Sequence, residues 1–222
     1  MTNDSKLVSE KKLVSVVMLS SGSREITLAN LKQLFSMKPE HWRLDVHLII
    51  EGANEATLSL IESLDSEIQV FPVSGRLTAS KCRAKVARNL AKDSEAALWL
   101  GANTIFKSDT YNQIANFHRQ YPSSILIGQF QDEVTSQISA GGCAKPWALF
   151  GKKDLLLAEK LPADVAGFDQ NLVFIPHSAF SKIGHPTGWL DQLNTSALFV
   201  ARAKRKRIRC LAIPGNLGTV LR

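Results

Sequence analysis

The chain has 222 residues, and 45% of them are hydrophobic, which is enough for one domain with a substantial buried core. No apolar run approaches the roughly 20 residues that span a bilayer, and the short apolar run at 14–19 lacks the cleavage site of a signal peptide. The formal net charge of +7 favours anionic partners: nucleotide diphosphates, nucleic acid or an anionic membrane face. The three cysteines are widely spaced, so we expect reduced thiols in a cytoplasmic protein.

Buried strands and amphipathic helices alternate along the first part of the chain. Residues 1–12 are mostly polar and predict a flexible lead-in. Strands are predicted at residues 13–20, 43–50, 67–73 and 96–100, and helices around 28–35, at 56–64, in the basic stretch after Ala79, and at 110–119. This alternation with short connections predicts an α/β fold with a mostly parallel sheet.

The strand at 96–100 is apolar throughout, which is typical of a strand covered on both faces. It stops at Gly101, Ala102, Asn103 and Thr104. In open α/β sheets, ligands bind just past the carboxyl ends of the central strands. We therefore take this turn as the candidate centre of function.

The rest of the chain is less regular. Further strands are predicted at 124–130, 171–176 and 209–214, with helices at 177–183 and from Asp191 to Ala203. Residues 131–145 contain Gly141 and Gly142 and predict a long irregular loop, and residues 215–222 predict a short tail.

The central stretch resembles the nucleotide-sugar half of the family 2 glycosyltransferases, which have the GT-A fold. The match lies at Ala87-Arg88-Asn89, Trp99-Leu100 and Ala102, and the resemblance covers most of residues 13–214. It implies a GT-A-like (Rossmann-like) mostly parallel sheet flanked by helices. Residues 13–130 would form the nucleotide-sugar-binding half, and residues 131–222 the acceptor-side half of the same domain.

The resemblance also implies roles for single residues. Asp191 matches the position of the catalytic base in an inverting transfer from a UDP- or GDP-linked sugar to a glycan or lipid-linked acceptor. If the base is another residue, Asp132 and Glu133 are next in line. The expected donor-binding residues are Ser20, Ser21, Glu51, Lys81, Arg88, Asn103 and Arg205. An equally simple interpretation of Glu51 is that it caps the helix predicted after it.

The sequence departs from the family where the family binds its metal. Two aspartates there hold a divalent ion against the donor diphosphate, and they are replaced here by Gly101 and Asn103. We therefore expect no cofactor at this turn and no normal Mg²⁺ or Mn²⁺ site. Two hypotheses follow: either cationic side chains replace the metal, or the chain is a catalytically inactive GT-A-like binding or assembly protein.

Residues 202–209 carry six Lys and Arg side chains in eight positions. One interpretation is a solvated helix end, and another is a clamp that reaches the donor phosphates. The run also suits peripheral contact with an anionic membrane. It has no interleaved aromatic residues, which argues against a third function, nucleic-acid binding.

Overall fold

The computed structural model describes residues 11–20, 24–51, 59, 68–73, 76–90, 92–101, 103–136, 138–139, 142–143, 160–168, 171–184 and 192–221. Its helices are α1 (Arg24–Met37), α3 (Arg76–Asn89), α4 (Thr110–Gln120), α5 (His177–Ile183) and α6 (Gln192–Arg205). The longer strands are β1 (Lys12–Ser20), β2 (Trp42–Glu51), β3 (Ile68–Val73), β4 (Ala96–Leu100) and β12 (Leu172–Pro176). The shorter strands are β5 (Thr104–Phe106), β6 (Ile125–Ile127), β7 (Phe130–Asp132), β8 (Ile138–Ser139), β9 (Gly142–Cys143), β10 (Ala163–Asp164), β11 (Gly167–Phe168), β13 (Cys210–Ala212) and β14 (Gly218–Val220).

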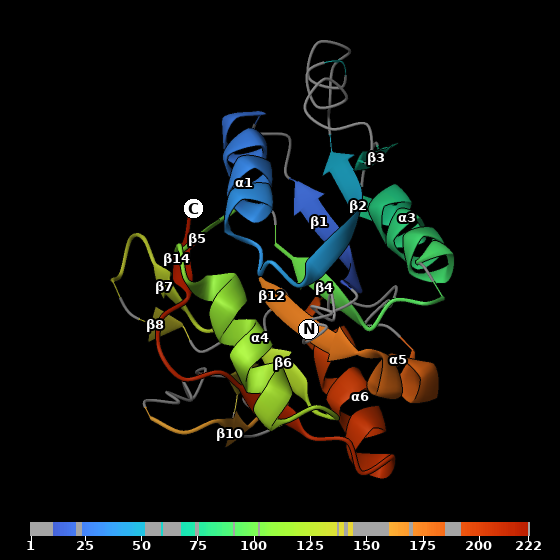
Figure 1. Ribbon diagram of the computed structural model, residues 1–222, viewed down its shortest axis with the longest axis vertical. Coiled ribbons are helices and arrows are strands. Elements are labelled where there is room, and N and C mark those ends of the chain that lie inside the picture. Colours follow the sequence, from blue (N-terminus) through green and yellow to red (C-terminus); the bar gives the residue numbers. More distant parts are fainter. Residues whose placement is uncertain are drawn as a thin grey trace, which may run out of the picture.

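An eight-stranded sheet with the order β10-β13-β6-β12-β4-β1-β2-β3 forms the centre of the molecule (Figure 1). The pairings β13–β6, β4–β1, β1–β2 and β2–β3 are parallel, whereas β12 and β10 run antiparallel to their neighbours. The expected α/β fold with a mostly parallel sheet is confirmed. The edge position of β3 explains why Pro72 is tolerated there, because an edge strand leaves one side without ladder hydrogen bonds.

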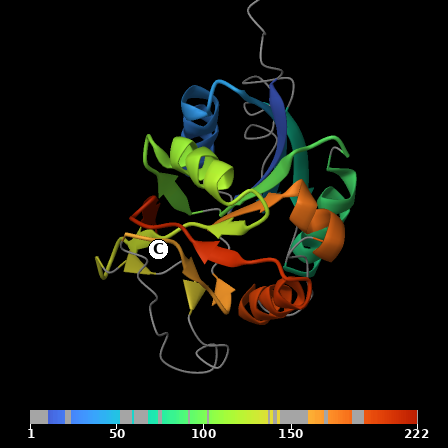
Figure 2. The ribbon, with the colours of Figure 1, turned by 60° about the horizontal axis from the view of Figure 1, so that its bottom comes forward.

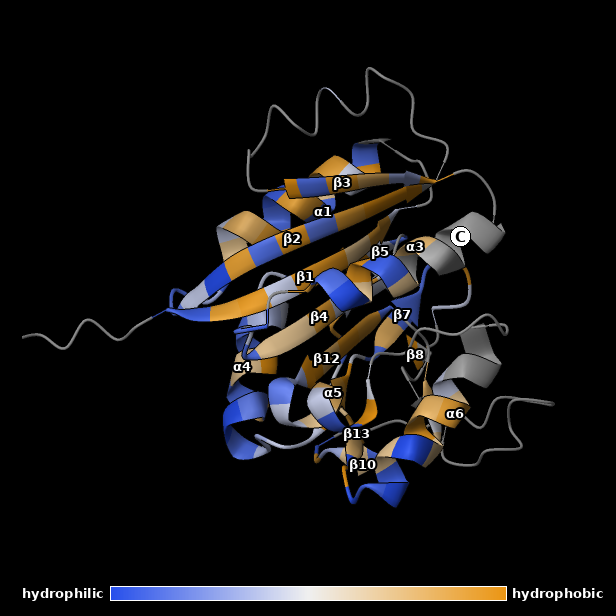
Figure 3. Cartoon of the chain, turned by 90° about the vertical axis from the view of Figure 1, so that its right-hand side faces the viewer, coloured by the Kyte–Doolittle hydropathy of each residue, from blue (hydrophilic) through white to orange (hydrophobic). Residues whose placement is uncertain are grey.

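Helices cover both faces of this sheet (Figure 2). On one face, Leu31 and Leu34 of α1 and Ile114 of α4 belong to the same buried cluster. On the other face, a second buried cluster joins residues of α3, α5 and α6. Side chains of the strands alternate between the two clusters, so the strands nearest the centre are apolar on both faces (Figure 3). Every residue of β4 is at most 3% exposed, as its apolar run predicts.

The prediction of a single strand at 124–130 is wrong, because the chain passes from one sheet to another within this range. β6 belongs to the central sheet, and β7 belongs to a four-stranded sheet with the order β5-β14-β7-β8. The change occurs at Gly128, where a Cβ atom would lie 2.9 Å from the ring of Phe130. Leaving the central sheet lets Phe130 pack against Phe106, with ring centroids 5.9 Å apart.

The predictions of an irregular loop at 131–145 and of a tail at 215–222 are also corrected. β7 and β8 pair as antiparallel neighbours, and residues 218–220 of the expected tail form β14, which lies between β5 and β7. Pairings between segments so far apart in the chain leave no local signal in a sequence. The helix expected at 56–64 lies outside the described residues apart from Ser59, and so does Gly141. In the part of the chain that the structure describes, no helix is long and apolar enough to cross a membrane.

Candidate functional site

The carboxyl ends of three neighbouring parallel strands meet at one edge of the central sheet. β4, the strand that precedes Gly101, lies beside β1, and β1 lies beside β2. Ser20 ends β1 and Glu51 ends β2, so both backbone positions lie at the same edge as the turn at Gly101. This is the position at which open α/β sheets bind ligands. The expectation that the turn follows a central strand is confirmed.

Asn171 anchors the turn from the neighbouring strand. It precedes β12, which runs antiparallel to β4, so the start of β12 lies at the same edge as the end of β4. The N–H of Gly101 donates to the carbonyl oxygen of Asn171 at 2.8 Å, and the hydroxyl of Thr104 donates to its Oδ1 at 3.4 Å. Sequence analysis missed this role. An asparagine at position 171 points to a role in the turn only once β12 is known to lie beside β4.

The C-terminal segment fixes the other side of the turn. The N–H of Leu221 donates to the carbonyl oxygen of Asn103 at 2.7 Å. Nearby, the carbonyl oxygen of Leu217 accepts the N–H of Lys107 at 2.8 Å and the hydroxyl of Thr110 at 2.7 Å. The turn is therefore held between two segments that follow it by more than sixty residues.

Ser20 is tied to the first helix. Its hydroxyl forms a hydrogen bond with the hydroxyl of Thr27 in α1, and both side chains are buried. Because buried hydroxyls need a partner, this pair stabilises the connection between β1 and α1. Ser21, its expected companion in donor binding, lies outside the described residues.

Two of the expected cationic donor ligands lie toward the other edge of the sheet. Arg88 is in the last turn of α3, which leads back to the amino end of β4. Arg205 ends α6, and β13, which runs in the same direction as β4, begins a few residues later. β4 alone has five residues and so spans about 16 Å. The structure does not bring Arg88 or Arg205 to the turn at Gly101. Lys81 lies nearer the start of α3, where only its backbone is described.

Of the three carboxylates considered as the general base, the structure describes two. Asp191 lies outside the described residues, one position before α6. Asp132, a second candidate, is buried, and its Oδ1 accepts the N–H groups of Val134 at 3.0 Å and Thr135 at 2.9 Å. These bonds give Asp132 a local role in the turn after β7. Glu133 is exposed.

The residues of the turn do not fit a divalent metal ion. Mg²⁺ and Mn²⁺ favour carboxylate and other oxygen ligands, whereas Gly101 has no side chain and Asn103 has one neutral amide oxygen. Within the described ranges, no group of three or more His, Cys, Asp or Glu side chains is arranged to hold a metal. Donor binding without a metal stays a prediction.

The comparisons with known proteins bear on the fold. No protein-family model matches the sequence, and no curated protein matches it. Among solved structures, the chain is similar to the crystal structure of GalNAc-T7 with UDP, GalNAc and Mn²⁺, with a TM-score of 0.70 and 14% sequence identity. The likeness covers 96% of this chain but only 44% of that one, so the chain spans less than half the length of the protein that it matches. At this identity the likeness establishes the fold, and the chain has a GT-A-like fold.

Proposed function

We propose that this protein is a glycosyltransferase that moves a sugar from a nucleotide-sugar donor to a glycan or lipid-linked acceptor. The observation that supports the proposal is the turn at 101–103, which follows β4 beside the carboxyl ends of β1 and β2 in a GT-A-like fold. The similar structure, GalNAc-T7, was determined with UDP, GalNAc and Mn²⁺. The resemblance of the sequence to the family 2 glycosyltransferases supports the same reaction class.

Such a transfer makes three chemical demands. The departing diphosphate must be stabilised as its negative charge develops. The acceptor hydroxyl needs a general base, and we assign this role to Asp191. The sugar must be held in line between acceptor and leaving group. In this proposal the donor contacts Ser21, Glu51, Lys81 and Asn103, whereas Ser20 supports the turn through Thr27.

The most direct test is donor binding by the full chain. We expect calorimetric titration with a panel of UDP- and GDP-linked sugars to find one donor with a dissociation constant below about 1 mM, the upper end of ordinary substrate affinities. The variant Asn103→Leu keeps roughly the size of the side chain and removes its polar atoms, and it should lower the affinity for that donor. If no nucleotide sugar binds the wild type, the transferase proposal is wrong.

A second candidate function is a catalytically inactive GT-A-like protein that binds or assembles with others. The replacement of both turn carboxylates by Gly101 and Asn103 favours it. The two functions separate experimentally, because an inactive relative that binds a donor would show no transfer and no slow donor hydrolysis over many hours.

A further inference from the structure

The net charge of the molecule is concentrated at its C-terminal end. Residues 192–222 hold seven Lys and Arg side chains and no Asp or Glu. The whole chain has 27 basic and 20 acidic residues, so residues 1–191 hold 20 of each and have no net charge. The +7 of the protein therefore comes entirely from the last segment, which contains α6 and the turn that follows it.

Six of the seven cations form one exposed group, which we call the basic end of α6: Arg202, Lys204, Arg205, Lys206, Arg207 and Arg209. Two of them have structural partners. Arg202 donates to the carbonyl oxygen of Ile183 at 3.1 Å, and Arg209 pairs with Asp164 at 2.8 Å. Among the described residues, the side chains from Lys204 to Arg207 make no hydrogen bond or salt bridge.

Fold stability explains only part of this group. Basic residues in the last turn of a helix interact favourably with its dipole, which accounts for Lys204 and Arg205. The effect fades beyond the last turn, whereas Lys206 and Arg207 continue the run outside the helix. Placing four exposed cations side by side is otherwise unfavourable, because like charges repel. An anionic partner removes that repulsion.

The surroundings of the basic end indicate the kind of anion. Leu198 lies one helical turn before Arg202 on the outer side of α6, and it is 56% exposed. The buried side of α6 is formed instead by Phe199, Val200 and Ala203. An exposed apolar side chain next to cations suits the boundary between lipid headgroups and acyl chains. The large hydrophobic side chains that are exposed in the described ranges include no aromatic ring, so we see no platform for stacked bases.

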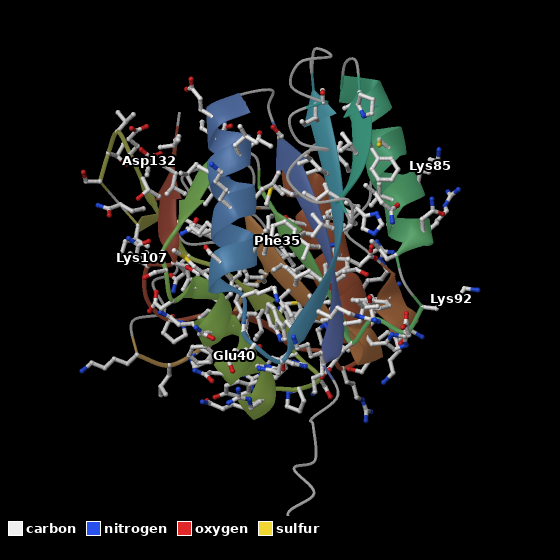
Figure 4. All side chains as sticks on the ribbon, turned by 45° about the horizontal axis from the view of Figure 1, so that its top comes forward. Phe35, Glu40, Lys85, Lys92, Lys107 and Asp132 are labelled. Carbon is white, nitrogen blue, oxygen red and sulfur yellow. The ribbon has the colours of Figure 1, made fainter. Side chains whose placement is uncertain are left out.

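We propose that the basic end of α6 binds the surface of an anionic lipid bilayer. The group lies at the periphery of the molecule, and it is the hydrophilic end of α6 in Figure 3. Further exposed cations, Lys85 and Lys92, project outward from α3 and from the turn after it (Figure 4), and α3 packs on the same face of the sheet as α6. The basic end precedes the amino end of β13, whereas the turn at Gly101 follows the carboxyl end of β4, which runs in the same direction. A protein docked through the basic end therefore leaves the turn at Gly101 uncovered.

The test is co-flotation of the full chain with vesicles. At low salt, wild-type protein should float with vesicles that contain about 30 mol % phosphatidylserine, should not float with pure phosphatidylcholine, and should dissociate at high salt. The variant Lys204→Gln/Lys206→Gln/Arg207→Gln should bind roughly a hundredfold more weakly, from the usual contribution of each basic residue near an anionic surface. The control Lys32→Gln/Lys107→Gln/Arg119→Gln removes the same charge from the other face of the molecule and should bind within about twofold of wild type.

Several outcomes would overturn the proposal. Equal weakening in the two triple variants would mean that net charge alone attracts the protein, without a specific surface. Binding to an oligonucleotide of about 20 nucleotides, without binding to the vesicles, would make nucleic acid the partner. Loss of donor affinity in the α6 variant, with vesicle binding unchanged, would assign the cations to the donor phosphates instead. Circular dichroism at each stage verifies that the variants are folded.

Discussion

His118, in the last turn of α4, lies against Glu95 and Phe174. Its Nε2 lies 3.5 Å from the Oε1 of Glu95, and its ring centroid lies 5.0 Å from that of Phe174. Burial lowers the pKa of His118 below its ordinary value of 6.5, and the hydrogen bond to Glu95 opposes this effect without reversing it. The folded state therefore takes up a proton at His118 less readily than the unfolded chain does.

This residue predicts how stability depends on pH. Above pH 6.5 both states hold His118 neutral, and its effect on the free energy of unfolding is constant. As the pH falls below 6.5, the unfolded chain is protonated first, so the fold should lose stability. Urea unfolding at several pH values from about 7.5 down to about 5 should show this loss in the wild type and a shallower one in His118→Gln. His41, whose pKa burial also lowers, would contribute to the loss that remains in the variant. Equal slopes for both proteins would refute the assignment to His118.

Asp191 carries the prediction that separates an enzyme from an inactive relative. Asp191→Asn keeps the size of the side chain and removes its basicity, so turnover should fall by roughly 10² to 10⁴ while donor affinity changes little. Transfer assays and calorimetry on the same samples measure the two effects. The matched control is Asp132→Asn, which changes the acid that the structure places in a local turn. If Asp132→Asn abolishes transfer and Asp191→Asn does not, the base has been misassigned.

At the scale of elements, β14 is the feature that joins the C-terminus to the turn. It pairs antiparallel with β5 and parallel with β7, and it leads directly to the hydrogen bond between Leu221 and Asn103. At Gly218 the two backbones approach so closely that a Cβ atom would lie 2.2 Å from the carbonyl oxygen of Ile105. Only glycine permits this approach without a shift of β5 or β14.

Gly218→Ala should therefore destabilise the protein by about 1 to 3 kcal/mol, the usual effect of an added methyl group in a closely packed place. Thr219→Ala is the control, since it changes the next residue of the same strand and should have a smaller effect, below about 1 kcal/mol. Urea unfolding measures both. A Gly218→Ala protein as stable as the control would show that β14 adjusts freely. In that case β14 would not hold the turn.

At the scale of the whole molecule, the two edges of the central sheet differ in chemistry. The carboxyl edge presents the neutral turn at Gly101 and Asn103, and the basic end of α6 lies before the amino end of β13. In the proposed transferase, which lacks the usual pair of carboxylates at this turn, side chains and backbone N–H groups would stabilise the donor diphosphate.

Donor binding should accordingly not depend on a divalent ion. We expect the affinity for the best nucleotide sugar to be the same within about threefold in EDTA and in Mn²⁺. The reason is that the turn has no carboxylates to hold a divalent ion against the phosphates. Calorimetry in the two buffers is the measurement. The variant Gly101→Asp/Asn103→Asp restores both carboxylates and serves as a positive control, since it should gain metal dependence if the turn faces the donor. A large gain for the wild type on adding Mn²⁺ would show that a metal site lies elsewhere in the chain.

Much of the architecture could be predicted because its causes are local. The unbroken apolar run at Ala96–Leu100 predicts a strand covered on both faces, and the change of residue type at Gly101 predicts where it stops. Pro72 predicts an edge strand or a strand end, and β3 lies at the edge of the sheet. Each of these inferences depends on residues next to one another in the chain.

The sequence by itself therefore determined the α/β class, most of the longer elements, the turn after β4 and the place in the chain where the net charge lies. Only the tertiary structure decided that β14 and Asn171 hold this turn, and that Arg88 and Arg205 lie toward the opposite edge of the sheet. The reason is physical. Hydrophobic periodicity is a property of side chains that are neighbours in the chain. Strand pairing depends instead on backbone N–H and C=O groups, which nearly every residue carries alike, so the sequence does not identify distant strand partners.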